Sequence, residues 1–166
     1  MTVRTGVRIG VDVGRARVGL AASDPSGTFA SPVATLARDE RDRTDLGEIA
    51  QIVRDRAAVE VVVGLPLLLS GKEGEAARLA REYAASLASR VEPVPVRLVD
   101  ERLTTVDAHR RLRESGVPGR GQRSVVDQAA AVLILQFAID AEAASGRPPG
   151  EAVGAARAAR KKERRR

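Results

Sequence analysis

The order of apolar patterns along the chain predicts an α/β fold, with a mixed five-stranded sheet and helices on both of its faces. Three short strand patterns come first, and two further strand patterns follow, each preceded by a helical pattern. Consecutive strands joined by short turns favour antiparallel pairing, whereas strands separated by helices are typical of parallel pairing. Because both arrangements occur in one chain, the sheet is predicted to be mixed.

The first third of the chain carries the predicted antiparallel meander. In residues 7–13, valine and isoleucine alternate with polar or small residues, which is the period-two pattern of a strand with two unlike faces. A second apolar run covers residues 18–22. The sequence D-P-S-G at residues 24–27 predicts a turn, and a third strand follows over about residues 29–36.

The later elements alternate between helical and strand patterns. Apolar residues at i, i+3, i+4 and i+7 predict a helix over 46–53, with Thr44 or Asp45 as its N-cap. The remaining expectations are a buried strand over 59–65, a helix over 76–87, a strand over 94–99, a helix capped by Thr104 or Thr105, and a long helix from Ser124 to about Asp140.

The chain of 166 residues fits one domain, which we place at residues 1–145. Residues 146–166 are rich in proline, glycine, alanine and arginine, and we expect them to form a disordered basic tail. The last ten residues hold seven basic side chains and one acidic one, so they account for the whole net charge of +6. Such a run suits phosphate binding and an ordinary solvated terminus equally.

The residue types that are missing narrow the class of protein. The chain has no cysteine, which removes disulfides, thiolate nucleophiles and cysteine zinc sites. It has neither a signal-peptide pattern at its start nor an apolar run of about 20 residues, the length that crosses a bilayer. We therefore expect a cytoplasmic protein that does not bind membranes.

Asp12 is the first candidate for chemistry. It lies in the middle of the first strand pattern, between Gly10 and Gly14 and opposite to the apolar face. A carboxylate in mid-strand is unfavourable unless something uses it, and flanking glycines let a ligand approach the backbone closely. The alternative interpretation is an aspartate on an edge strand that points into water.

Two more carboxylates are candidates at the end of the fifth strand. Asp100 and Glu101 are consecutive, so their side chains should leave a strand on opposite faces. Strand alternation places Glu101 with Val99 and Asp100 with Leu98, but the alternation weakens at a strand end and does not choose between them. The alternative role of this pair is a cap and salt-bridge cluster before a helix.

Asp127 falls in the first turn of the predicted long apolar helix. The helix dipole favours an anion there, so a purely structural role is reasonable for this residue alone. Together, however, Asp12, Asp127 and one strand-end carboxylate form a set of oxygen ligands that suits Mg²⁺ or Mn²⁺. Two such ions can hydrolyse a phosphodiester by activating water and stabilising the leaving oxygen.

Backbone contacts would have to hold a nucleic acid, because aromatic residues make up only 2% of the chain and offer no stacking platform. The candidates are arginines close in sequence to the carboxylates, although each of them is equally compatible with ordinary surface charge. They are Arg15, Arg17, Arg102, Arg120 and Arg123.

Four segments in order resemble the YqgF/RuvX family, whose members are described as pre-16S rRNA nucleases and as Holliday-junction-resolvase-like proteins. The segments are RIGVDVGRARVGLAASD, VVGLPLLLSGKEG, DERLTT and VDQAAAVLILQ, and the resemblance runs from about Arg8 to Asp140. It implies a ribonuclease-H-like fold. It also implies that Asp12, Glu101 and Asp127 are the metal carboxylates, with Asp100 in support and Gly64 to Gly71 as a loop bordering the site.

The resemblance further implies that the substrate is structured RNA, specifically a precursor of ribosomal RNA. Two other classes of function stay open. A resolvase of branched DNA would use the same chemistry and should be a symmetric homodimer, whereas the nuclease is expected as a monomer or homodimer. A binding module without turnover is disfavoured, because a pure binder gains nothing from carboxylates that face phosphates.

Overall fold

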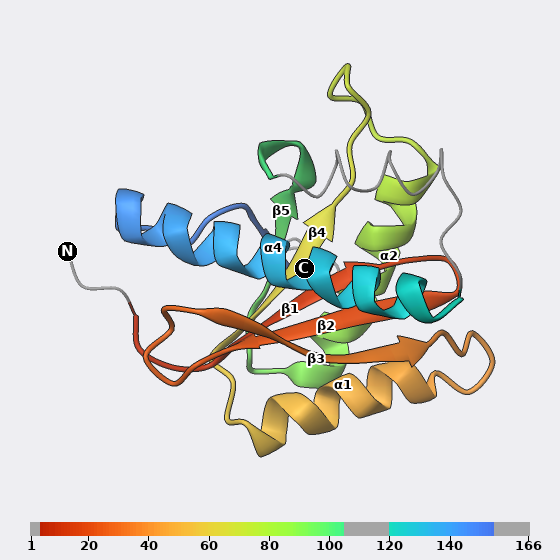
Figure 1. Ribbon diagram of the computed structural model, residues 1–166, viewed down its shortest axis with the longest axis horizontal. Coiled ribbons are helices and arrows are strands. Elements are labelled where there is room, and N and C mark those ends of the chain that lie inside the picture. Colours follow the sequence, from red (N-terminus) through yellow and green to blue (C-terminus); the bar gives the residue numbers. More distant parts are fainter. Residues whose placement is uncertain (1–3, 105–119, 155–166) are drawn as a thin grey trace, which may run out of the picture.

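A computed structural model describes residues 4–104 and 120–154 of the chain. Its centre is one six-stranded sheet with the strand order β3-β2-β1-β4-β5-β6 (Figure 1). The pairs β1–β2 and β2–β3 are antiparallel, and the pairs β1–β4 and β4–β5 are parallel. The predicted meander and its parallel continuation are confirmed. The strands are β1 (Arg8–Val13), β2 (Arg17–Ser23), β3 (Ala30–Ala37), β4 (Glu60–Leu65), β5 (Val96–Asp100) and β6 (Glu151–Val153).

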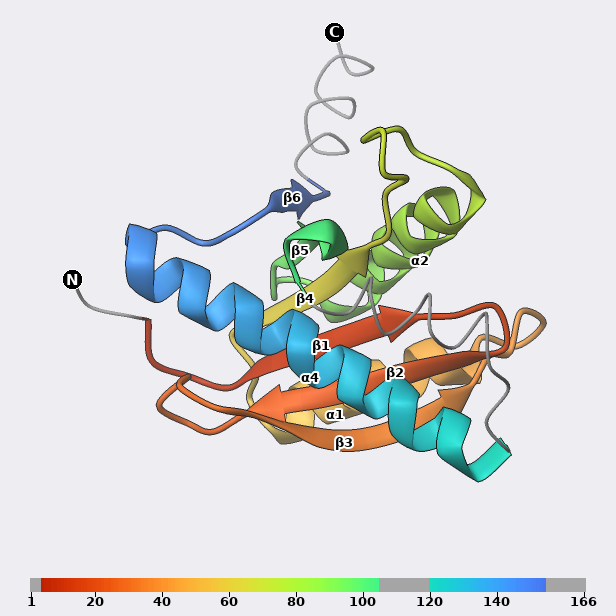
Figure 2. The same ribbon diagram turned by 45° about the horizontal axis from the view of Figure 1, so that its top comes forward.

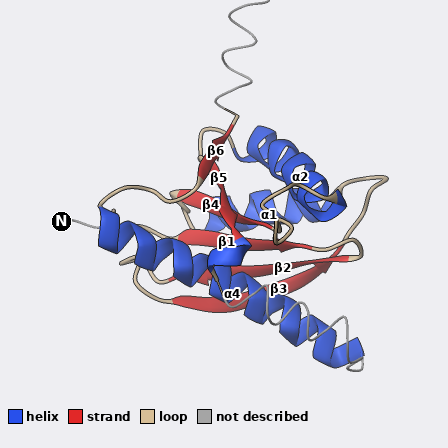
Figure 3. Cartoon of the chain, turned by 90° about the horizontal axis from the view of Figure 1, so that it is seen from above, coloured by secondary structure: helices blue, strands red, loops and turns tan. Residues whose placement is uncertain are grey.

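Helices cover both faces of the sheet, as predicted. The helices α1 (Thr44–Asp55) and α2 (Glu75–Val91) lie on one face, and the 26-residue α4 (Arg120–Ser145) crosses the other (Figures 2 and 3). Two hydrophobic clusters match these layers. The larger lies between the sheet and α1 and α2, and the smaller lies between the sheet and α4. No helix in the described ranges is both long enough and apolar enough to cross a membrane.

The alternation in β1 determines which residues face α4. Ile9, Val11 and Val13 belong to the larger cluster under α1 and α2. Gly10 faces the other way, because a Cβ atom on it would lie 2.7 Å from Cβ of Leu135 and 2.8 Å from the carbonyl oxygen of Ala131, both in α4. Contacts that short are closer than carbon atoms tolerate, so this glycine allows α4 to approach the sheet.

The sixth strand corrects the prediction of five. β6 pairs antiparallel with β5 through Val96 and Val153, Arg97 and Ala152, and Leu98 and Glu151. It lies within residues 146–166, which we had placed outside the folded domain. A three-residue strand is too short to give a periodic signal, and its partner strand, not its own composition, determines it. Residues 155–166 lie outside the described residues.

Two predicted helix starts differ from those in the structure, and a third lies outside the described residues. Neither Thr44 nor Asp45 is the N-cap of α1, because Arg43 takes that position in a left-handed conformation, with a φ of 55°. The helix α4 begins at Arg120, not at Ser124. After β5 the chain forms the 3₁₀ turn η1 (Glu101–Leu103), and the helix expected after Thr104 lies outside the described residues.

Candidate active site

Asp12 lies near the centre of the sheet. Its strand, β1, runs between β2 and β4, and only 3% of the residue is exposed. The edge-strand interpretation is therefore wrong. Asp12 is two residues beyond Gly10, so the alternation of the strand directs it to the face that α4 covers. A buried carboxylate costs free energy unless charges or hydrogen bonds compensate it. Asp12 therefore remains a candidate functional residue.

A glycine lies on each side of Asp12 in the sheet. Gly19 is its register partner on β2. On β4, Gly64 follows Val63, and Val63 pairs with the residue before Asp12. Both glycines leave room for another candidate. A Cβ atom on Gly19 would lie 2.1 Å from the carbonyl oxygen of Asp127, and one on Gly64 would lie 2.5 Å from Oε1 of Glu101.

The glycines thus bring the three candidates to one region of the fold. Glu101 lies over the β4 neighbour of Asp12, and the backbone of Asp127 lies over its β2 neighbour. All three residues are buried, with 2% of Glu101 and 8% of Asp127 exposed. The prediction included Gly10, Gly14 and Gly64 but missed Gly19. Its signal was available, because Gly19 shares the period-two face of β2 with Ala21, which packs under α4.

The structure separates the roles of Asp100 and Glu101. Val99 belongs to the cluster under α4 and Leu98 to the opposite one, so Glu101 lies on the side of α4, as strand alternation suggested. Asp100 instead closes the start of η1. Its carboxylate accepts hydrogen bonds from the backbone N–H of Arg102, at 2.9 Å, and from the Arg102 guanidinium, at 2.7 Å. That guanidinium holds the pKa of Asp100 below its usual range.

Asp127 lies deeper in its helix than we expected. Because α4 begins at Arg120, Asp127 is not in the first turn, where the helix dipole acts. A specific partner holds it instead. Nε of Arg17 donates to Oδ2 of Asp127 at 3.0 Å, and the Arg17 side chain is 34% exposed. This ion pair joins β2 to α4.

The candidate arginines that are described all form ion pairs. Arg17 pairs with Asp127, Arg102 with Asp100, and Arg15 with Glu75 at 2.8 Å. The Arg15 pair is a surface contact, since both side chains are about three-quarters exposed. Arg120 and Arg123 belong to the first turns of α4, and their side chains lie outside the described part.

Gly14 and Thr104 close turns beside the site. The backbone N–H of Gly14 donates to the carbonyl oxygen of Arg17 at 2.8 Å, in the turn between β1 and β2. Thr104 donates to the carbonyl oxygen of Glu101 through both its backbone N–H, at 2.9 Å, and its hydroxyl, at 2.7 Å. Both contacts fix the backbone next to a candidate carboxylate.

The donor chemistry fits a hard divalent cation, because the three candidates offer only carboxylate oxygens. Their side chains are not arranged as a metal-binding group in this structure. Within residues 4–104 and 120–154, no group of three or more acidic or histidine side chains lies close enough together to hold a metal ion. Binding an ion between all three residues would therefore require their side chains to turn toward one another.

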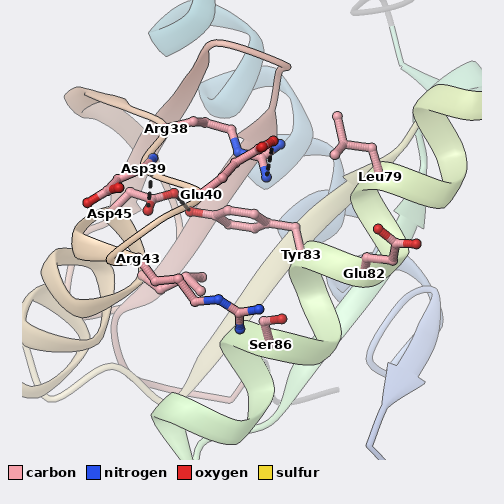
Figure 4. Close-up of a pocket in the computed structure, with 10 residues that line it drawn as sticks. Arg38, Asp39, Glu40, Arg43, Asp45, Leu79, Glu82, Tyr83 and Ser86 are labelled. Carbon is pink, nitrogen blue, oxygen red and sulfur yellow. Dashed lines mark hydrogen bonds and ion pairs between the residues drawn. The ribbon is translucent and has the colours of Figure 1, made fainter.

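A separate pocket of about 250 Å³ lies on the opposite side of the sheet, between the start of α1 and the middle of α2 (Figure 4). Inside it, the hydroxyl of Tyr83 donates to Oδ2 of the buried Asp45 at 2.8 Å, and the Arg38 guanidinium lies 5.1 Å from the centre of the Tyr83 ring. None of the three candidate carboxylates lines this pocket. Asp45, which we had considered as a helix cap, instead links α1 to α2 through its buried hydrogen bond with Tyr83.

The mixed sheet with helices on both of its faces defines the class of fold. The fold is the predicted ribonuclease-H-like one. Among solved structures, it is shared with RuvC of T. thermophilus in complex with a Holliday junction substrate. The TM-score is 0.53, with 13% identity over 84% of this chain and 97% of that one.

Sequence comparison gives the family. Residues 6–141 match the family RuvX, which is described as Holliday junction resolvase. This chain belongs to the RuvX family. A relative from Frankia casuarinae is 62% identical over 142 residues, which are 86% of this chain and 70% of the relative. Another, from Nocardioides sp., is 58% identical over 153 residues, covering 91% and 98%. Both carry the name "Putative pre-16S rRNA nuclease".

Proposed function

We propose that this protein is a nuclease that hydrolyses phosphodiester bonds with divalent metal ions, and that its substrate is precursor 16S ribosomal RNA. One observation carries the chemistry: Glu101 and Asp127 are buried over the two glycines that flank the buried Asp12. The names of the two relatives support the substrate, and the description of the family supports a nucleic acid.

Asp12, Glu101 and Asp127 are the residues that would hold Mg²⁺ or Mn²⁺. When bound, such ions activate water for in-line attack and stabilise the leaving oxygen of the phosphodiester. The cations also resolve a conflict within the site. Burying a carboxylate costs free energy, and that cost falls when positive charge is placed beside it.

The protein supplies a rigid support for these carboxylates. Asp12 is fixed by a strand with hydrogen-bonded neighbours on both sides. Glu101 is fixed by η1, and Asp127 by a helix that packs across the sheet through Ala131, Ile134 and Leu135.

The proposal is tested by incubating the purified protein with Mg²⁺ or Mn²⁺ and labelled precursor 16S RNA. We expect cleavage, and we expect Asp12→Asn to lower its rate at least 100-fold, on the order of the loss that follows when metal coordination is disturbed. Asp55→Asn is the matched control, because Asp55 is an exposed carboxylate on α1, on the other face of the sheet. Equal rates for Asp12→Asn and the parent protein would contradict the proposed site.

A DNA junction resolvase is the second candidate, and the description of the family favours it. The same assay separates the two functions if a labelled four-way DNA junction is run beside the RNA. A resolvase would cut the junction in preference to the RNA. It would also behave as a symmetric dimer in sedimentation, because a junction presents two equivalent strands.

A further inference from the structure

Arg17 makes an unusual contact for a residue beside a metal site. Its guanidinium lies against Asp127, one of the three carboxylates that would take part in metal binding, and the Nε–Oδ2 distance is 3.0 Å. Neighbouring contacts hold β2 and α4 close together at this ion pair. Arg17 and Gly19 lie on the same face of β2, and Gly19 admits the backbone of Asp127 at close range. The next residue of α4, Gln128, donates to the hydroxyl of Thr35 on β3 at 3.2 Å.

The ion pair has a consequence for metal binding. Oδ2 of Asp127 interacts with a positive charge already, and the three carboxylates do not form a metal-binding group within the described chain. A cation held by all three residues would compete with the guanidinium for this carboxylate. The two positive charges would repel each other at such short range.

We propose that Arg17 is a built-in counter-cation of the site, which neutralises Asp127 in the metal-free protein and is displaced from it when a divalent ion binds. This inference rests on the proposed function, because it assumes that Asp127 is a metal ligand. It assigns to Arg17 a role different from the phosphate contact that the sequence suggested. Arg17 acts through Asp127 and is therefore a positioning residue.

Arg15 provides the matched control. It lies two residues before Arg17, in the turn between β1 and β2, and also forms an ion pair, but its partner is the exposed Glu75. Arg15→Gln and Arg17→Gln each remove one positive charge near the start of β2, whereas only Arg17→Gln removes the guanidinium that pairs with Oδ2 of Asp127.

The experiment is a calorimetric titration of Mn²⁺ into the metal-free protein and its variants, with no nucleic acid present. We expect Arg17→Gln to bind Mn²⁺ about three- to fivefold more tightly than Arg15→Gln, which is the range that a partly exposed ion pair supports. We also expect Arg17→Gln to lower the Tm of the metal-free protein and to enlarge the rise in Tm on adding Mn²⁺. Equal or weaker Mn²⁺ binding by Arg17→Gln overturns the proposal.

Two further measurements keep the result decisive. If Arg17→Gln does not fold, the Arg17 Nε–H signal is followed by NMR in the parent protein during addition of Mg²⁺. A shift that saturates with Mg²⁺ binding supports displacement, and an unchanged signal overturns it. Asp127→Asn separates this inference from the proposed function. If Asp127→Asn weakens Mn²⁺ binding while Arg17→Gln leaves it unchanged, the role of Arg17 is wrong and the metal site stands; if Asp127→Asn has no effect, both are wrong.

Discussion

At the scale of single residues, Asp100 and Glu101 show how neighbouring carboxylates take different roles. Glu101 is 2% exposed on the face that α4 covers, while Asp100 holds the Arg102 guanidinium and the start of η1. Val99 packs under α4 and Leu98 on the opposite face, so the two carboxylates that follow leave β5 on opposite sides. Glu101 therefore lies on the same face of the sheet as Asp12.

This assignment predicts unequal effects from two nearly identical substitutions. Glu101→Gln should lower the cleavage rate at least 100-fold, on the order of a lost metal contact, because it removes a charged ligand. Asp100→Asn should keep most of the activity, since its ion pair with Arg102 is partly exposed and worth about 1 kcal/mol or less. Steady-state kinetics on both variants check this. A larger loss of cleavage rate in Asp100→Asn than in Glu101→Gln would mean that Asp100, not Glu101, is the metal ligand.

The residue scale also shows what the sequence could and could not predict. Strand alternation alone indicates that Asp12 faces away from the core under α1 and α2. At the end of β5 alternation does not choose between Asp100 and Glu101, and the structure separates them. The contact between Arg17 and Asp127 has no such signal, because the two residues are 110 positions apart and the register of α4 on the sheet decides it. Local periodicity contains no information on that register.

At the scale of elements, the close approach of α4 to β1 and β2 assembles the site. Glycines at positions 10 and 19 remove the side chains that would otherwise keep the helix away. The start of α1 illustrates a local failure of sequence reasoning. Thr44 and Asp45 are good N-cap residue types, but Asp39 accepts hydrogen bonds from the Thr44 backbone and hydroxyl, and Asp45 is drawn into the interior by Tyr83. A local contact with the preceding loop decided the case of Thr44, and a tertiary contact decided that of Asp45.

Gly19→Ala tests the approach of α4. Its new methyl group would meet the carbonyl oxygen of Asp127 at 2.1 Å, so we expect a loss of about 1–3 kcal/mol in the free energy of unfolding. The cleavage rate of the folded variant should also fall, because the new methyl group displaces Asp127.

Gly47→Ala in α1 is the control. The nearest neighbour of its Cβ, an Arg90 guanidinium nitrogen, is 3.7 Å away, so it should stabilise the protein by about 0.5–1 kcal/mol. Urea unfolding and kinetics on both variants measure the difference; unchanged activity in Gly19→Ala would mean that the helix does not position Asp127.

Tyr83 joins α2 to α1, and it predicts a dependence of stability on pH. Burial, and then the hydrogen bond to Asp45, raise the pKa of Tyr83 above its ordinary value of about 10. The folded protein therefore keeps a proton that the unfolded chain loses, and stability should fall as the pH rises above about 10. Tyr83→Phe should weaken this alkaline loss. At pH 7 it should cost about 1–3 kcal/mol, because the buried Asp45 loses a donor.

The chain contains a single tyrosine, so tyrosinate absorbance reports on Tyr83 directly. Urea unfolding of the parent protein and Tyr83→Phe between pH 8 and about pH 11 supplies the comparison, with lysine titration as a background common to both proteins. If tyrosinate forms in the folded parent protein near pH 10, the proposed coupling to Asp45 is wrong.

At the scale of the whole molecule, a buried ionic network ties the far end of α4 to the sheet. Glu142 interacts with Arg4 at 2.6 Å and with Arg8 at 3.0 Å, and Arg4 also contacts Glu60 at 2.9 Å. Arg8, Glu60 and Glu142 are almost fully buried. The helix is thus fixed by ion pairs at both ends of its described contact with the sheet, through Arg17 at one end and Arg8 at the other.

Glu142→Ala should lower the free energy of unfolding by about 3–5 kcal/mol, because it leaves the buried Arg8 guanidinium without its carboxylate. Asp140→Ala is the control on the same helix; Asp140 is exposed, and its loss should change stability by about 0.5 kcal/mol or less. Chemical unfolding followed by circular dichroism compares them. Similar midpoints for the two variants would show that the network adds little to the attachment of α4.

The central claim is that Asp12, Glu101 and Asp127 seat divalent cations together. A crystal structure of the protein soaked in Mn²⁺, with anomalous scattering used to locate the ions, tests it most directly. The account predicts Mn²⁺ in direct contact with carboxylate oxygens of all three residues, beneath α4. Mn²⁺ bound elsewhere, with these three side chains still apart, would contradict it.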